Sequence, residues 1–308
     1  MIQKFFAALI SICFFCSLAK ADELWLKNIS TAKLNELYQQ IGYTGITEKS
    51  WLMLPSKRYP AVFLKKFPAD FAKIEDSEQR NSLFIKIMAP LALKLNQDIL
   101  KERQLILDID RDFKQNQKIS STQLKTLEEK AAKYDVFTRL KDHERIDFLV
   151  SELLKRIDII SPSIMISLAA IETDFGSSRI VKEGNSLYKV LQWHTQSGLK
   201  PIGEDENADY RIKTYPDIYQ AIKDFALRIN SNINFDFFRT ARAEIHSSTN
   251  PEQLIGKPLI AYAFTNSELK NYAGIIEYIL SYYELFIIDQ STLDTTVITK
   301  QIIKKYAN

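Results

Sequence analysis

The amino-acid sequence predicts a mainly α-helical fold, and three observations carry that prediction. Leu, Ile, Lys, Glu and Ala, which are common in helices, fill most of the long stretches. The 308 residues include only 8 Gly and 9 Pro, which is few for a chain built from many tight β turns. Apolar residues recur every three or four positions over several long segments, as they do along one face of a helix. With 46% hydrophobic and 26% charged residues, the composition is that of a globular protein.

Residues 1–21 are typical of a secretory signal peptide. Lys4 lies in a short basic start, Phe5 to Ala19 form an apolar run, and Ala19-Lys20-Ala21 has the small residues of a cleavage site. The alternative is a membrane anchor, which needs about 20 apolar residues, and this run is shorter. We therefore expect cleavage before Asp22 and an exported, periplasmic protein.

Removal of this segment would change the cysteine content and the charge. Cys13 and Cys16 both lie inside it, so the mature chain would have no disulfide, thiolate chemistry or cysteine-bound metal. Loss of Lys4 and Lys20 would lower the formal net charge from +3 to +1. Nucleic-acid binding depends on clustered cations, so a near-neutral chain predicts no nucleic-acid partner.

The first half of the mature chain changes from irregular to helical. Residues 22–64 mix apolar and turn-prone stretches, which predicts an irregular N-terminal wrap. From about Asp76 to Asp112, apolar residues recur every four positions, and Pro90 interrupts them. Because proline disturbs a helix interior, this pattern predicts two helical pieces or one kinked helix.

Two further amphipathic helices are predicted at Ser121 to Tyr134 and at His143 to Ile157, because charged residues cover one face of each. These patterns divide the mature chain after the wrap into three parts. We assign residues 65–150 to a helical N-terminal region, residues 151–289 to the main domain and residues 290–308 to a C-terminal tail.

The clearest helix boundaries lie between Ser161 and Gly176. Ser161 is a favourable N-cap, and Pro162 suits the first helical position. Gly176 can take the left-handed conformation that ends a helix. The apolar residues on one face of this predicted helix of about four turns are Ile164, Leu168, Ile171 and Phe175.

Glu172 occupies an unusual position for a carboxylate on this helix. It follows Leu168 by four residues, so it lies about 40° round the helix and borders the apolar face. The negative end of the helix dipole and partial burial would both raise its pKa. A carboxyl group that keeps its proton near neutral pH can act as a general acid. The alternative is an ordinary solvent-facing charge, as Asp174 beside it shows.

Several ordered motifs resemble those of bacterial peptidoglycan β-N-acetylglucosaminidases, and the sequence is most similar to the Bax-type members, relatives of the flagellar glucosaminidase. The likeness covers roughly residues 65–289. Its central motifs are Ile159-Ile160-Ser161-Pro162-Ser163, Ala169-Ala170-Ile171-Glu172-Thr173-Asp174-Phe175-Gly176-Ser177-Ser178-Arg179 and Glu183-Gly184-Asn185-Ser186-Leu187-Tyr188. Outside them it extends through Pro90, Asn96, Arg103, Asn230, Phe238-Arg239, Ala241-Arg242-Ala243 and Asp289.

The resemblance implies a lysozyme-like helical domain with a small β hairpin, preceded by an N-terminal helical extension. It also implies that Glu172 is the catalytic acid. The local sequence agrees with a hairpin, because Leu187 to His194 and Tyr210 to Tyr215 flank a polar loop. Family members often carry a second carboxylate on such a hairpin, and we expect it to be Glu206, although a merely solvated loop would look the same.

The resemblance also identifies residues expected to bind the sugar chain. Tyr262 resembles the family's active-site tyrosine, and Tyr272 its second tyrosine, at a longer spacing than usual. Asn185 belongs to the matching motif that precedes the hairpin. Tyr188 and Trp193 are local aromatic residues that could pack on sugar faces. For Phe175, core packing is the more natural role.

The expected substrate is the glycan strand of peptidoglycan, cleaved after N-acetylglucosamine. The sequence leaves open whether a second carboxylate or the substrate's own acetamido group completes the reaction. A muramidase or lytic transglycosylase is an alternative, because it shares the fold and needs one catalytic Glu. Thr173, Asp174, Phe175 and Ser186 depart from the family pattern, so a non-catalytic wall-binding or scaffold protein is a second alternative.

No motif in the sequence indicates a cofactor, a nucleotide or a metal. His143, His194 and His246 lack the spacing of metal ligands, and no phosphate-binding loop or serine triad motif is present. Asp108 and Asp112 belong to a run of alternating aspartates that imitates the start of a calcium loop without its required Gly and Glu. This run is expected to be a solvated helical face.

Overall fold

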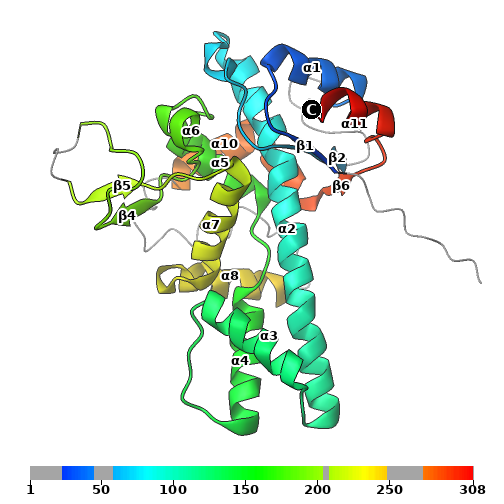
Figure 1. Ribbon diagram of the computed structural model, residues 1–308, viewed down its shortest axis with the longest axis vertical. Helices are drawn as coiled ribbons and strands as arrows, with labels where there is room; N and C mark the ends of the chain where they lie inside the picture. Colours follow the sequence, from blue (N-terminus) through cyan, green and yellow to red (C-terminus); the bar gives the residue numbers. More distant parts are fainter. Residues whose placement is uncertain (1–22, 45–57, 204–207, 248–272, 308) are drawn as a thin grey trace, which may run out of the picture.

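The fold is mainly α-helical, as the sequence predicts, with three small two-stranded sheets among the described residues. The structure is a computed structural model that describes residues 23–44, 58–203, 208–247 and 273–307. In Figure 1 the long helix α2 (Ser77–Asn116) runs along most of the molecule. Helices α5 (Pro162–Thr173) and α7 (Ile218–Ser231) pack beside it.

Helix α2 is one continuous helix, which decides between the two arrangements that Pro90 left open. Asp76 caps its start by accepting hydrogen bonds from the backbone N–H groups of Glu78 and Gln79. Pro90 is buried inside the helix, in a run of buried residues from Leu83 to Asn96 that is broken only at Lys86. The cost of a proline in a helix interior is therefore offset by burial of apolar surface around it.

The two predicted amphipathic helices are confirmed as α3 (Ser121–Lys133) and α4 (Asp142–Arg156). A capping box between Ser120 and Gln123 starts α3. The alternating aspartates that resemble the start of a calcium-binding loop lie on helix α2. There Asp108 forms an ion pair with Arg111, and Asp110 forms one with Lys114. None of the described helices is both long and apolar enough to cross a bilayer.

The N-terminal segment contains regular elements where the sequence predicted an irregular wrap. They are β1 (Leu24–Leu26), α1 (Thr31–Gln40), β2 (Arg58–Pro60) and β3 (Val62–Leu64). Strand β1 pairs with β3 in parallel, so two stretches 38 residues apart in the sequence lie side by side. Each strand has three residues, which is too short for the alternating pattern by which strands are recognised in a sequence.

The predicted C-terminal tail pairs with this N-terminal segment. Strand β6 (Thr292–Asp294) runs parallel to β2, and helix α11 (Lys300–Tyr306) lies beside α1 (Figure 1). Lys305 joins the two helices through a hydrogen bond of 2.7 Å to Glu36. The domain boundaries drawn from the sequence stay predictions.

The small β hairpin is confirmed, with strands shorter than predicted. Strand β4 (Leu191–Trp193) pairs antiparallel with β5 (Tyr210–Ile212), after the short helix α6 (Arg179–Gly184). In Figure 1 the hairpin projects from one side of the helices. Gly198 allows the returning loop to approach β5, since a Cβ there would lie 2.5 Å from the backbone oxygen of Ile212.

After the hairpin, the chain continues through α7, a 3-10 helix η2 (Ile233–Phe235) and helix α8 (Asp236–Ser247). The next described elements are α10 (Ala273–Tyr282) and a 3-10 helix, η5 (Leu285–Gln290). Both α10 and η5 pack against α5. Helix α5 is therefore covered by α2, α10 and η5, and it lies in the core.

Two arginines, buried Arg242 and partly buried Arg103, satisfy backbone carbonyl groups between α4 and α5. The guanidinium of Arg242, on α8, donates hydrogen bonds of 3.0–3.3 Å to the carbonyl oxygens of four residues, Lys155, Arg156, Asp158 and Ile159. Arg103, on α2, donates to the carbonyl oxygen of Ile157 at 2.8 Å and to that of Leu154. Unpaired buried carbonyl groups are costly, so these bonds hold the path of the chain into α5.

Amide side chains complete this arrangement. Asn96 of α2 donates to the carbonyl oxygen of Ile160 at 2.8 Å and accepts from its N–H at 3.1 Å. Asn230 of α7 donates to the carbonyl oxygen of Asp158 at 3.0 Å and accepts from Arg242 at 2.8 Å. The family-like positions Asn96, Arg103, Asn230 and Arg242 thus share one structural task, which is to fix the start of α5.

Replacing Arg242 should destabilise the fold more than replacing an exposed arginine. Arg242→Met leaves several buried carbonyl groups without a donor, and we expect the free energy of unfolding to fall by about 3 kcal/mol or more. Arg145→Met, which removes an exposed ion pair with Glu128, is the control and should cost at most about 1 kcal/mol. Urea unfolding measures both variants, and equal losses would contradict the role assigned to Arg242.

Candidate active site

Glu172 lies in the last turn of α5, at the edge of an otherwise buried helix. The residues of α5 before Ile171 are all buried, and so is Thr173, whereas Glu172 is half-buried. The position predicted from the helical period, at the border of the apolar face, is therefore confirmed. The helix is shorter than the four turns predicted, because it ends at Thr173.

The chain leaves α5 through a tight left-handed turn. Asp174, Phe175 and Gly176 have φ values of 48°, 49° and 79°, so the reversal begins two residues before the glycine that predicted it. Thr173 stabilises the turn, because its hydroxyl accepts a hydrogen bond of 2.9 Å from the N–H of Gly176. A Cβ at position 176 would lie 2.9 Å from the ring of Phe84. This close approach to a buried ring requires glycine there.

The residues in which the motif departs from the family pattern have contacts of their own. Phe175 packs edge-on against Phe84 and Tyr283, with ring centroids 5.7 and 5.6 Å away, which confirms its predicted place against the core. The Asp174 carboxylate accepts a hydrogen bond of 2.6 Å from Ser177. These substitutions build the turn after Glu172.

The other predicted site residues differ in how they are placed. Glu206, Tyr262 and Tyr272 lie outside the described residues. Trp193 is exposed on the hairpin, 61% accessible, with its ring 4.9 Å from that of Tyr210. An accessible indole on a projecting hairpin suits the sugar contact predicted for it.

Tyr188 and Asn185 are buried. The ring of Tyr188 stacks on Phe225 with centroids 3.8 Å apart. Asn185 takes a left-handed conformation at the end of α6, and its side chain donates a hydrogen bond of 2.8 Å to the carbonyl oxygen of Tyr215. Each has a structural contact in addition to the substrate contact predicted from the sequence, which stays a prediction.

The start of α5 is held by a carboxylate from far along the chain. Ser161, the N-cap residue, makes no capping hydrogen bond with its own side chain. Asp289 of η5 supplies the cap, because its Oδ1 accepts a bond of 2.8 Å from the backbone N–H of Ser163. Its Oδ2 accepts from the hydroxyls of Ser161 and Ser163 at 2.8 and 2.7 Å. We call this group of three residues the α5 clamp.

The α5 clamp contains more oxygen–oxygen contacts than its two serine hydroxyl hydrogens can fill. The hydroxyl oxygens of Ser161 and Ser163 also lie 2.8 Å apart, so three oxygen atoms are in mutual contact. Two hydroxyl hydrogens cannot fill three such contacts, and a proton on Asp289 completes the set. Burial raises the pKa of the Asp289 carboxyl to about 6, and the hydrogen bonds from Ser163 and Ser161 moderate the rise.

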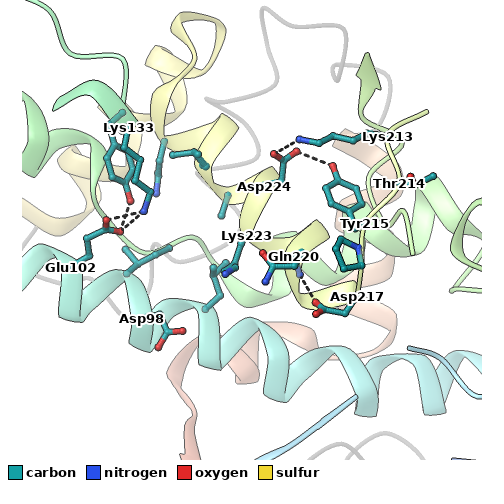
Figure 2. A pocket seen from close by; sticks show the side chains of 17 residues that line it. Asp98, Glu102, Lys133, Lys213, Thr214, Tyr215, Asp217, Gln220, Lys223 and Asp224 are labelled. Carbon is teal, nitrogen blue, oxygen red and sulfur yellow. Dashed lines mark hydrogen bonds and ion pairs between the residues drawn. The ribbon is translucent and has the colours of Figure 1, made fainter. Parts of the chain in front are cut away.

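A cavity of about 690 Å³ lies between α2, α7 and the segment 213–217 (Figure 2). Most of its charged side chains are paired with each other. Asp224 accepts from Lys213 at 2.7 Å and from the hydroxyl of Tyr215 at 2.8 Å, and Glu102 accepts from Lys133 at 2.8 Å. Glu172 does not line this cavity. These pairs join neighbouring elements and neutralise four of the seven charged side chains that line the cavity, which leaves less charge to attract a ligand.

Comparison with known proteins agrees with the resemblance drawn from the motifs. The glucosaminidase family model, described as mannosyl-glycoprotein endo-β-N-acetylglucosaminidase, matches residues 149–308, just over half of the chain. The protein bax of Escherichia coli strain K12 is 24% identical over 184 residues, which cover 58% of this chain and 61% of that protein. The chain thus spans less than two thirds of that relative's length. No solved structure matches the chain.

Asp289 is one of the positions that resemble the family, but the sequence does not indicate which residues it contacts. Its partners lie 126 and 128 residues earlier, and no local pattern connects positions so far apart. The one available signal was Ser161 followed by Pro162 at a helix start, which indicates a cap without naming the group that completes it. The structure adds Asp289 to the residues that position Glu172.

The α5 clamp should make stability depend on pH. The pKa of Asp289 is raised from 3.8 to about 6 on folding, so the native state binds more protons between these values. Stability should therefore be highest below about pH 4 and fall by about 3 kcal/mol, relative to Asp289→Asn, as the pH rises through 6. Denaturant unfolding at several pH values measures this difference. Asp174→Asn, which removes an exposed carboxylate, is the control, and parallel profiles for wild type and Asp289→Asn would contradict the prediction.

Proposed function

The chain belongs to the glucosaminidase family, a family of glycoside hydrolases, and on that basis we propose that it is an endo-β-N-acetylglucosaminidase acting on peptidoglycan. It cleaves the glycan strand after N-acetylglucosamine. The description of the family names a mannosyl-glycoprotein substrate, whereas the motifs of this chain resemble those of the peptidoglycan enzymes. The segment 1–21, with the features of a signal peptide, favours the cell wall, because an exported protein meets that polymer.

One observation carries the proposal. Glu172 is a half-buried carboxyl group in the last turn of a buried helix, and it stands within the longest family-like motif. Its helix is held at the start by the α5 clamp and at the end by a left-handed turn. A group that must deliver a proton to one oxygen atom has to be held within a fraction of an ångström, and rigid helices provide that.

Glu172 acts as the general acid. It donates its proton to the glycosidic oxygen as the bond to the leaving sugar breaks. A positive charge then develops at the anomeric carbon of N-acetylglucosamine. Either a second carboxylate, for which Glu206 is the prediction, or the acetamido oxygen of the same sugar stabilises that carbon. Exposed Trp193 on the hairpin supplies a ring on which a sugar can pack.

A muramidase or lytic transglycosylase would use the same acid at the neighbouring bond. The two activities differ in the sugar that carries the new reducing end, and no described contact distinguishes them. The wall-binding alternative rests on the departures at Thr173, Asp174, Phe175 and Ser186. Thr173 and Asp174 form hydrogen bonds within the turn after Glu172, Phe175 packs against the core, and Ser186 is buried, so these departures have structural roles that an active enzyme can accommodate.

Digestion of purified peptidoglycan tests the proposed function. Glu172→Gln keeps the shape of the side chain and loses its acidic proton, so we expect the rate to fall by about 10²- to 10⁴-fold. Glu129→Gln, an exposed carboxylate on α3 outside the family-like motifs, is the matched control and should retain the wild-type rate. The rate is measured as fragments released from the insoluble wall.

The fragments themselves distinguish the alternatives. After borohydride reduction, mass spectrometry should find reduced N-acetylglucosamine at the new ends. Reduced muramic acid would identify a muramidase, and anhydromuramic ends a transglycosylase. Wall binding without release of fragments by wild-type protein would identify a binding protein.

A further inference from the structure

A second cavity, of about 760 Å³, adjoins the turn that follows Glu172. One wall consists of residues 27–30 and 66–72, from the N-terminal segment, and the other of Gly176, Ser177 and one face of α6. The cavity therefore lies between the predicted wrap (residues 27–30), the start of the predicted helical N-terminal region (residues 66–72) and the turn that follows the proposed acid. We call it the wrap cavity.

Three lysines line the wrap cavity, and their ammonium groups have no carboxylate partner. Lys27, Lys66 and Lys182 are exposed, and within the described ranges none of them forms an ion pair or a side-chain hydrogen bond. Elsewhere in the described structure, Lys94, Lys114 and Lys213 each pair with a carboxylate. Three unneutralised cations on the walls of one cavity create a positive potential that attracts anions.

The carboxylate that lines this cavity is already engaged. Asp70 accepts hydrogen bonds from the backbone N–H of Thr31 at 3.0 Å and from its hydroxyl at 2.6 Å, and these bonds hold the start of α1. Those bonds contribute to a lowered pKa of Asp70. Asp70 keeps its negative charge in these bonds, so the wrap cavity carries three lysines against one carboxylate. In the cavity of Figure 2, by contrast, two of the three lysines, Lys133 and Lys213, pair with carboxylates of the same cavity.

The walls of the wrap cavity also offer apolar surface. Phe67 is half-buried and presents part of its ring, whereas Phe71 and Val181, each 2% exposed, support the wall from behind. Phe67 and Phe71 pack edge-on with their centroids 4.9 Å apart, which gives the wall a fixed shape. A cavity of this kind suits a ligand that combines carboxylates with short aliphatic groups, because each part of the ligand finds its counterpart.

From these contacts we infer that the wrap cavity binds the peptide stem of peptidoglycan. This inference rests on the proposed function. The stem branches from the muramic sugar beside each N-acetylglucosamine, and it carries several free carboxylates and small aliphatic side chains. Gly176 follows Glu172 by four residues, which span at most about 14 Å. A stem of three or four residues reaches that far, so a strand held at Glu172 can place a stem between the lysines.

Binding of a soluble stem peptide tests the site without requiring catalysis. The probe is the tripeptide L-alanyl-γ-D-glutamyl-diaminopimelate, titrated by calorimetry into full mature protein carrying Glu172→Gln. We expect saturable binding that weakens as salt is added, since the contacts are between charges. Adding Lys66→Glu and Lys182→Glu should weaken it at least tenfold. The matched control adds Lys118→Glu and Lys125→Glu, which reverse two exposed charges remote from the wrap cavity and should leave binding unchanged.

Two further measurements complete the test. The same tripeptide with its carboxylates converted to amides should bind at least tenfold more weakly to the unaltered site. With active wild-type protein, strands that carry stems should be cleaved faster than strands stripped of them, and Lys66→Glu with Lys182→Glu should reduce that ratio.

The outcomes separate the two proposals. Absence of tripeptide binding, or equal weakening in the Lys66/Lys182 and Lys118/Lys125 variants, overturns the stem site even if the protein digests peptidoglycan. Tripeptide binding that depends on Lys66 and Lys182 supports the stem site even if no digestion occurs. Thermal unfolding of each variant shows whether it is folded at the temperature of the titration.

Discussion

The backbone carbonyl groups that close α4 are the constraint on which the rest of the structure depends. Here the chain turns from α4 into the buried start of α5, where water cannot reach these carbonyl groups to hydrogen-bond them. Arg242 donates to four of these carbonyl oxygens, and burial lowers its pKa to about 10, which leaves it charged at neutral pH. The guanidinium offers five N–H donors in a planar fork, against three on the ammonium group of a lysine, so it can satisfy more of these carbonyl groups at once. Helices α2, α7 and α8 therefore meet where α5 begins.

That meeting point determines where Glu172 lies. Helix α5 is a rigid rod of 12 residues with both ends held. The α5 clamp fixes its start to η5, and the left-handed turn through Gly176 packs its end against Phe84. Because η5 supplies Asp289, this 3-10 helix belongs to the same framework as the residues around Glu172. A change at the clamp can therefore act on the acid from the opposite end of the helix.

The two cavities differ in how their charges are used, and this difference bears on function. Around the cavity of Figure 2, Lys213 and Lys133 are neutralised by acids from neighbouring elements, so the charges serve to join helices. Around the wrap cavity, Lys66 and Lys182 face solvent without such partners. Unpaired cations stabilise a folded protein little and repel one another. Their placement beside the turn after Glu172 is more readily understood through an anionic ligand than through stability.

The sequence by itself determined helices α2 to α5, the hairpin, the family and the border position of Glu172, because periodicity, caps and motifs are local properties. It also indicated Asn96, Arg103, Asn230 and Arg242 as family-like positions, without their shared task. The tertiary structure decided which distant groups meet: Asp289 with Ser161, Arg242 with the end of α4, and β2 with β6. Apolar periodicity records only that a face is buried. Which donor satisfies a buried carbonyl group, and which lysines share a cavity, follow only once the elements are packed together.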